Sequence, residues 1–385
     1  LSKFPGIDLS STIISLRETQ YRALTLLRPG LIALLLFGLS CSFQLLFGQI
    51  LVDPSQDDPD YDTNKEMGMM QVAENDDASL NLNRPTVSKQ ANASQQMPGP
   101  CFVARDASFI AVPRNDDGSL NLNIPFSFEL YGTSYNSLWI NTNGNISFGG
   151  PLSAFSSTGF PTSTPMVAPF WADVDTRNTL GGQIYYKINP TNIIVTWEGV
   201  GYYNQMVDKR NTFQVIISTL ADPLTGVGNN VTFGYGDMQW TTGSASGGTG
   251  GFGGTPATLG VNAGNNIDFV QVGRFNTAGT IYDGPSGSNN GVDFLDDGCF
   301  NFDVSSAGNV PPTALDFPAA PVTIACGETF METYSFIAPE NGQNVSAVVN
   351  ANGACNTTSS TTSGSIATVT VTLHGDLCNL GTNTI

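Results

Sequence analysis

The chain has 385 residues, of which 40% are hydrophobic and only 12% are charged. Its 32 acidic and 14 basic residues give a formal net charge of −18. A phosphate backbone would repel so acidic a chain, which argues against nucleic-acid binding. The length allows two or three domains. A chain rich in Gly, Asn, Ser and Thr favours short strands joined by polar turns.

The N-terminal segment has the layout of an export signal. Residues 31–47 contain no charged residue, follow three arginines and precede several aspartates. Basic residues before an apolar core and acidic residues after it direct the downstream chain out of the cell. We expect residues 1–52 to form one hydrophobic helix, either a signal peptide cleaved after Ser42 or an uncleaved signal anchor. The core is short for a span of about 20 residues, which favours cleavage, and only an uncleaved segment would contact the membrane.

Residues 53–100 have the composition of an acidic, polar linker, with few large apolar side chains. An internal repeat begins inside them, because residues 75–85 and 115–125 are identical at nine of eleven positions. Leucine alternates with asparagine in both copies, which is the period of a strand. One interpretation is a decaying duplication without a role. The other is a spare edge strand that pairs with a sheet of the same or a neighbouring molecule.

Residues 101–305 contain short runs rich in β-branched and aromatic residues, each ended by Gly, Asn or Pro. Long stretches with a helical period are almost missing, so this region predicts a compact all-β sandwich or barrel. The expected strands are residues 127–131, 137–148, 182–188, 193–197, 212–218, 230–235 and 258–262.

Five motifs inside this region follow one another in a characteristic order. They are Leu-Trp-Ile-Asn-Thr-Asn-Gly-Asn-Ile-Ser-Phe-Gly at 138–149, Ala-Pro-Phe-Trp-Ala-Asp-Val-Asp at 168–175, and shorter aromatic segments at 184–186, 195–197 and 211–215. In this order and spacing they resemble the NIDO domain, the nidogen-like extracellular module of nidogens, tectorins and membrane mucins. The resemblance covers roughly residues 120–300. It implies a secreted or cell-surface protein of the matrix or adhesion type, without enzymatic activity.

Two cysteines, Cys101 and Cys299, bracket the NIDO-like region. Export favours oxidised cysteines, so we predict that they form a disulfide that ties the two ends of the domain together. Closing so long a loop is worth roughly 5 kcal/mol in the chain-entropy model.

Residues 310–385 predict a second β module, with Pro311-Pro312 at the boundary. It is similar to immunoglobulin-like modules, but its expected strands are fewer than the about seven of a complete sandwich, so we expect a partial one. Of its three cysteines only two can pair with each other, and we favour Cys355–Cys378 over a bond to Cys326. The expected strands are residues 322–325, 329–337, 344–349 and 366–373.

Asp173 and Asp175 are two residues apart and would share one face of a strand. This spacing permits a shared Ca²⁺ ion. The simpler interpretation is that the two acids cap turns or pair with Arg177 or Lys187. No other cofactor is expected. Further oxygen donors for the ion would come from Asp293, Asp296 and Asp297.

Five asparagines lie in Asn-x-Ser/Thr sequences, the acceptors of N-glycosylation. In an exported chain several of them are expected to carry glycans. They are Asn92, Asn145, Asn230, Asn344 and Asn356.

The single histidine, His374, lies in a context that indicates neither a catalytic triad nor a zinc site. We therefore expect no enzyme. The first interpretation of function is an extracellular structural or adhesion protein, whose NIDO-like domain contacts other extracellular proteins and whose second module acts as a spacer. Two alternatives remain, a surface glycan-binding module and a self-assembling filament subunit that exchanges strands between copies.

Overall fold

The computed structural model describes residues 51–54, 58–68, 87–88, 101–306, 312–315, 325, 327–337, 344–349, 357–364 and 366–374. Within them the protein is almost entirely β-structure, which confirms the all-β prediction. No helix in these residues is long and apolar enough to span a membrane. The predicted N-terminal helix, the cleavage site after Ser42 and the first copy of the repeat lie outside the described residues. The helical elements are α4 (Tyr61–Glu66), η1 (Ser244–Ser246) and η2 (Val292–Leu295).

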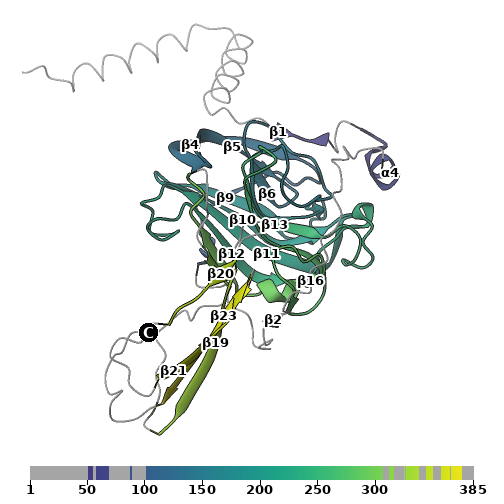
Figure 1. The fold of residues 1–385 in the computed structure, drawn as a ribbon. Coiled ribbons are helices and arrows are strands. Elements are labelled where there is room, and N and C mark those ends of the chain that lie inside the picture. The colour runs from purple at the N-terminus through teal and green to yellow at the C-terminus, as the bar shows by residue number, and fades with distance from the viewer. Residues whose placement is uncertain are drawn as a thin grey trace, which may run out of the picture. The chain divides into compact units, whose positions relative to one another are not determined.

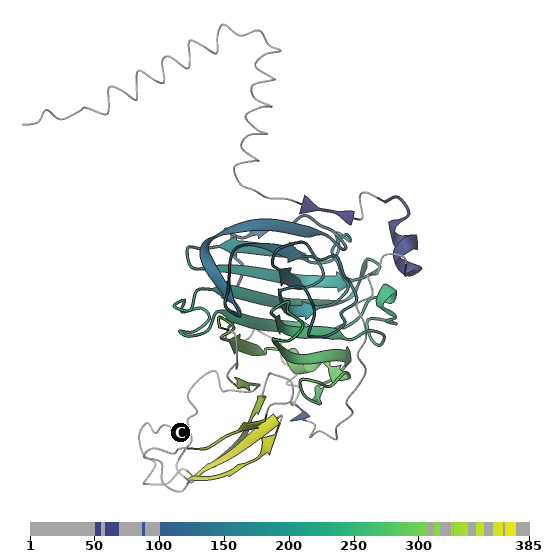
Figure 2. The ribbon, with the colours of Figure 1, turned by 45° about the horizontal axis from the view of Figure 1, so that its top comes forward.

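Two large sheets form the central sandwich (Figures 1 and 2). Neighbouring strands are antiparallel except β14 and β16, which are parallel. The first sheet has the order β1 (Leu51–Val52), β4 (Ser119–Leu130), β5 (Thr133–Asn141), β6 (Asn145–Ser147), β7 (Met166–Trp171), β13 (Ala257–Asn262), β14 (Phe269–Thr277) and β16 (Asn290–Gly291). The second has the order β17 (Cys299–Phe302), β12 (Val231–Met238), β11 (Met206–Ser218), β10 (Asn192–Tyr202), β9 (Gln183–Ile188) and β3 (Ile110–Ala111), with β8 (Val174–Asp175) also paired to β10. A separate pair joins β2 (Val87–Ser88) to β15 (Ile281–Tyr282).

Aromatic side chains join the two sheets in the core. The ring of Phe170 on β7 lies 5.5 Å from that of Phe213 on β11, and Phe213 stacks on Trp197 at 5.0 Å. Burying each Phe side chain contributes about 1.5–3 kcal/mol. Trp171 and Trp240 are buried as well. Three of the four tryptophans therefore serve as core anchors, and Trp139 is half-buried.

The turn between β5 and β6 shows why glycine is needed at Gly144. Its φ is +73°, and an added Cβ would lie 1.9 Å from the carbonyl oxygen of Phe170. Any other residue would be strained in this conformation and would collide with the backbone of β7. The single strand expected over residues 137–148 is therefore two strands, β5 and β6, joined by a tight turn at Gly144.

The strand β4 is longer than the prediction of residues 127–131. Its register with β5 shifts between Asn123 and Phe128, and Pro125 falls in this irregular stretch. Proline is tolerated at such bulges because no ladder hydrogen bond is lost there. The second copy of the repeat therefore leads into one continuous strand, whose alternate side chains from Leu120 to Leu130 are buried.

The C-terminal region contains a four-stranded sheet and a two-stranded one among its described residues. Strands β19 and β23 match the predictions for residues 329–337 and 366–373. The immunoglobulin-like character of this module stays a prediction, and Cys326, Cys355 and Cys378 lie outside the described residues. The larger sheet has the order β18 (Thr313–Ala314), β19 (Thr329–Ile337), β23 (Ile366–His374) and β21 (Thr357–Thr361), and the smaller joins β20 (Val345–Ser346) to β22 (Ser363–Gly364).

A disulfide joins Cys101 to Cys299, with their Cα atoms 5.9 Å apart. Cys299 is the first residue of β17, at the edge of the second sheet. The bond therefore connects the beginning of the continuous domain to its last strand, as the sequence predicted.

Candidate functional site

A segment upstream of the domain docks onto it. Strand β1 pairs with β4, so that Leu51 lies opposite Leu120. The helix α4 follows and lies close to η1 (Figure 1). Tyr61 and Lys65 lie four residues apart on one helical face, and both are buried. Described residues on both sides of the expected boundary at residue 52 thus pack against the domain, while the division into a signal segment over 1–52 and a linker over 53–100 stays a prediction.

Lys65 is the centre of the site, and its side chain is fully buried. The ammonium Nζ lies 2.9 Å from Asp116 Oδ2, 3.0 Å from Asp117 Oδ1 and 2.7 Å from Asp173 Oδ1. Its three N–H groups are thus each matched by a carboxylate. The rings of Phe155 and Tyr203 lie 4.3 and 4.2 Å from Nζ, which adds cation–π attraction.

The three carboxylates come from two loops of the first sheet. Asp116 and Asp117 immediately precede β4, in a turn closed by a hydrogen bond from Gly118 N to Asp116 O of 2.8 Å. Asp173 lies between β7 and β8, and its carbonyl accepts a hydrogen bond from Tyr203 N. The second copy of the repeat and the Trp-Ala-Asp-Val-Asp motif therefore meet at one point.

Further contacts of α4 surround the buried lysine. Tyr61 Oη donates to Asp116 Oδ2 at 3.0 Å and also contacts Asp117. Arg177 bonds to Asp175 at 2.6 Å and to Asp62 of the helix at 2.9 Å. The helix is thus held by charged and polar contacts on two sides of the lysine.

The glycine-rich loop at residues 241–254 forms another wall of the site. A Cβ on Gly243 would lie 2.5 Å from Asp173 Oδ2, so glycine lets the loop approach this carboxylate. Ser244 Oγ donates to Glu66 Oε1 at 2.9 Å. The loop therefore packs against the helix through η1.

Burial and crowding shift the protonation of these groups. Burial disfavours the charged form of Lys65, but attraction to the three carboxylates outweighs it, so the pKa of Lys65 lies above its ordinary value. Burial raises the pKa of Asp173 to about 7, although Lys65 acts in the opposite direction. Burial and then repulsion from Asp117 raise the pKa of Asp116 well above its usual range. The pocket therefore favours positive charge and bound protons.

The structure does not gather the five aspartates predicted as calcium ligands, of which only Asp173 belongs to the acidic group among the described residues. Asp173 joins the acids before β4, while Asp175 pairs with Arg177, as the simpler interpretation expected. Asp296 accepts a hydrogen bond from Met238 N at the end of β12. Neither Asp296 nor Asp297 belongs to the acidic group that the described residues form.

Two of the predicted glycosylation sites lie in the interior of the folded domain. Asn145 and Asn230 are buried, and their side chains bond to Asn143 O and Glu129 O. A glycan has no room at either position. Asn344 is exposed, and glycosylation there stays a prediction. Asn92 and Asn356 lie outside the described residues.

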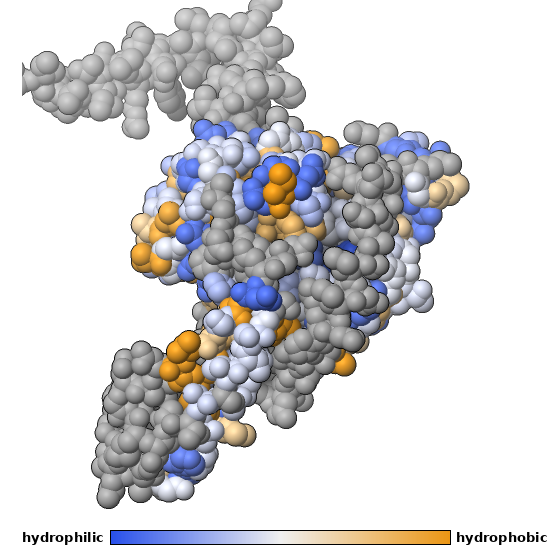
Figure 3. Space-filling model, in the orientation of Figure 1, coloured by the Kyte–Doolittle hydropathy of each residue, from blue (hydrophilic) through white to orange (hydrophobic). Residues whose placement is uncertain are grey.

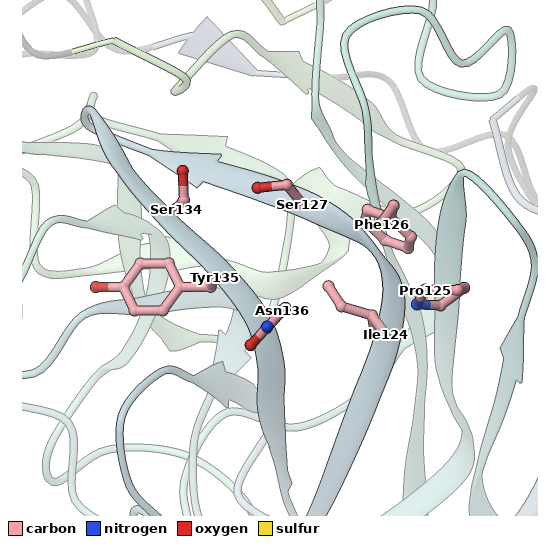
Figure 4. A pocket seen from close by; sticks show the side chains of 7 residues that line it. All are labelled: Ile124, Pro125, Phe126, Ser127, Ser134, Tyr135 and Asn136. Carbon is pink, nitrogen blue, oxygen red and sulfur yellow. The ribbon is translucent and has the colours of Figure 1, made fainter.

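A second hollow lies at the irregular register of β4 and β5 (Figure 4). It measures about 490 Å³ and is lined by apolar side chains and small polar ones. No acid, base or cysteine lines it, so it has no group for ion binding or acid–base chemistry, unlike the Lys65 pocket. The lining residues are Ile124, Pro125, Phe126, Ser127, Ser134, Tyr135 and Asn136.

Comparison with known proteins identifies the domain that carries this pocket. Residues 100–290 match the family model described as NIDO related. These residues form a NIDO-like domain. Alpha-tectorin of Gallus gallus is 34% identical over 179 residues, 39% of this chain and 8% of the relative. The NIDO-like domain makes this an extracellular protein, secreted or at the cell surface.

Two other relatives align over shorter regions. Dendrite extension defective protein 1 of Caenorhabditis elegans is 28% identical over 150 residues, 32% of this chain and 12% of the relative. Nidogen of Drosophila melanogaster is 27% identical over 116 residues, 23% of this chain and 8% of the relative. The chain thus spans 8–12% of the length of these three relatives. No solved structure matches it.

Proposed function

We propose that this chain is a structural protein of the extracellular matrix or of cell adhesion, and that its NIDO-like domain acts through contacts with other extracellular proteins. The observation that carries this proposal is the domain shared with alpha-tectorin and nidogen. We propose no catalytic activity. The downstream β module would act as a spacer.

The surface of the domain agrees with a role in polar contacts. On the face in Figure 3, hydrophobic side chains form separate patches between hydrophilic ones. The net charge of −18 favours basic partners. In the described part of the chain, His374 is exposed and shares a 2.9 Å hydrogen bond with Thr329, which is not the setting of a general base.

Expression of the tagged chain in secreting cells would test the proposal. We expect the protein in the insoluble matrix or at the cell surface, where denaturant releases it together with bound extracellular proteins. A cysteine-to-serine variant at Cys101 and Cys299 provides a control with a weakened domain. Recovery of the intact chain only as a free soluble protein, with no matrix or surface fraction, would contradict the proposal.

A filament subunit that exchanges segments between copies is the second candidate. It is favoured by the way residues 51–68 bind, because a two-residue strand and a helix with one buried lysine are elements that a second copy could supply equally well. Light scattering on the full chain and on a deletion of residues 51–68 tests this idea. Identical masses at every concentration would remove it. Glycan binding is less favoured, since Trp171, Trp197 and Trp240 are buried.

A further inference from the structure

We propose that the pocket around Lys65 is a calcium site whose resident cation is the lysine itself, and that Ca²⁺ competes with Lys65 for it and frees the α4 segment from the domain. The NIDO-like domain would thereby carry an arm whose attachment depends on the extracellular calcium concentration.

The carboxylates have the spacing of a single cation site. One oxygen each from Asp116, Asp117 and Asp173 lie within 4.8 Å of one another. Two ligands on opposite sides of a Ca²⁺ ion, each at 2.3–2.6 Å, are separated by about this distance. The ammonium of Lys65 now lies at this point, at 2.7–3.0 Å from the three acids.

A fourth buried side chain lies beside these carboxylates and carries an unused oxygen. Asn143 is fully buried, and its Nδ2 donates to Asp117 Oδ1 at 2.8 Å, the oxygen that Lys65 also contacts. The amide oxygen of Asn143 has no hydrogen-bond partner. Asp116 Oδ1 and Asp173 Oδ2 are also buried without one. A lysine has three hydrogens to donate, whereas Ca²⁺ takes six to eight oxygens, so the pocket offers more acceptors than Lys65 can use.

When its carboxylates are ionised, the negative charge of the pocket exceeds what its cations neutralise. Asp175 adds a fourth buried carboxylate, and among the described residues Lys65 and Arg177 are the cations paired with the four. A divalent ion in the place of the ammonium neutralises one more negative charge. The donors are all oxygen, the ligand type of Ca²⁺. Mg²⁺ requires near-ideal octahedral geometry and retains its water, so this crowded pocket selects against it.

Exchange of the cation would loosen the whole helix. Ca²⁺ and Lys65 use the same oxygens and exclude each other. Tyr61 bonds to two of the same carboxylates, so it loses its partners to the ion as well. Arg177 to Asp62, Ser244 to Glu66 and Tyr203 Oη to the carbonyl oxygen of Asp62 are then the remaining side-chain bonds to the helix among the described contacts. All three involve partly exposed groups.

The experiment compares the full chain with Lys65→Met, Asp173→Asn and the control Lys187→Met, which removes a partly exposed lysine outside the pocket. Calcium binding is measured by calorimetry, and hydrogen exchange of residues 58–68 is followed in CaCl₂ and MgCl₂ at equal ionic strength, up to roughly 10 mM, since extracellular sites bind at about 10⁻⁴–10⁻³ M. We expect Lys65→Met to bind Ca²⁺ at least tenfold more tightly than the parent. In the parent, Ca²⁺ but not Mg²⁺ should increase exchange of residues 58–68.

Two outcomes would overturn the proposal. One is a natively folded Lys65→Met protein that binds no Ca²⁺. The other is unchanged exchange of residues 58–68 in the parent at the highest Ca²⁺ concentration, which decides the matter even if Lys65→Met does not fold. Asp173→Asn should abolish the calcium response, and Lys187→Met should retain it. Partner binding in the matrix is not needed for any of these measurements, so their failure is distinct from a failure of the proposed function.

Discussion

Replacing Lys65 by methionine should detach the α4 segment and leave the sandwich folded. Methionine retains most of the apolar stem, so packing against Phe155 and Tyr203 is largely preserved. The ammonium is lost, and three carboxylates with at most 4% exposed side chains are left without their cation. Removing one partner of a buried ion pair costs about 3–5 kcal/mol.

The lost energy should make the α4 segment open more easily, with little effect on the rest of the domain. Because Lys65 lies outside the apolar core cluster of the sandwich, the lost energy lowers the free energy of opening residues 58–68. A loss of about 3–5 kcal/mol corresponds to a roughly hundredfold to several-thousandfold faster exchange of the protected amides of α4. Hydrogen exchange with mass spectrometry measures it. The experiment uses a buffer above pH 7, because below its pKa of about 7 Asp173 could take up a proton and offset the lost ammonium.

The control is Lys187→Met, which removes a pair to Asp106 at 3.1 Å between largely exposed side chains. Such a pair contributes about 0–1 kcal/mol, so the control should change exchange little. Equal protection of residues 58–68 in both variants would refute the view that the buried ammonium holds the helix.

Four further predictions follow from the structure. Serine at both Cys101 and Cys299 should lower the free energy of unfolding by about 2–5 kcal/mol, measured by denaturant titration. A midpoint equal to that of the oxidised parent would contradict the role given to this bond. Gly144→Ala should lower the free energy of unfolding more than Gly149→Ala does. Both glycines have positive φ, but only a Cβ at Gly144 would collide with a backbone atom. The left-handed conformation costs about 1–2 kcal/mol and the collision about 1–3 kcal/mol more, so equal losses would argue against the close approach. The folded state holds a proton on Asp173 that the unfolded state has lost above about pH 4, and this stabilisation disappears as the pH rises through about 7. Stability should therefore fall across this window, and Asp173→Asn should flatten the profile; an unchanged slope would mean that another group is responsible. Peptide mapping of the secreted protein should find Asn145 and Asn230 without glycans, because both are buried, and a glycan on either in the folded protein would contradict their placement.

The sheet structure could be predicted wherever alternation and turn residues agree. Residues 182–188 and 258–262 were expected as strands and form β9 and β13 within one residue. The Leu-Asn alternation of the repeat indicated the first part of β4, and residues 127–131 were expected as its second part. Only the shifted register with β5 explains how the strand continues through Pro125. The strand β14 was not predicted from its residues either.

The site was only partly visible in the sequence. Asp173 was recognised as a candidate, and Asp116 and Asp117 lie in the repeat, but their common partner was not foreseen. Lys65 lies 51, 52 and 108 residues away from these acids. Contacts between residues so far apart in the sequence form only when the sheets assemble. The pattern of side chains within one polar segment does not indicate them. The weak sign was a lysine beside a tyrosine in an otherwise acidic stretch.

The buried charges at Lys65 are better explained by specificity than by stability. Replacing a buried ion cluster with well-packed apolar residues is often neutral or stabilising, so stability alone would not favour four buried carboxylates around two cations. An apolar helix could slide on an apolar surface, whereas Lys65 fits only where three oxygens converge. The cluster therefore fixes one position for α4 and, with it, the pairing of Leu51 with Leu120. It also makes that position responsive to other cations, because removing or replacing a single positive charge changes the electrostatic energy of every carboxylate in the pocket.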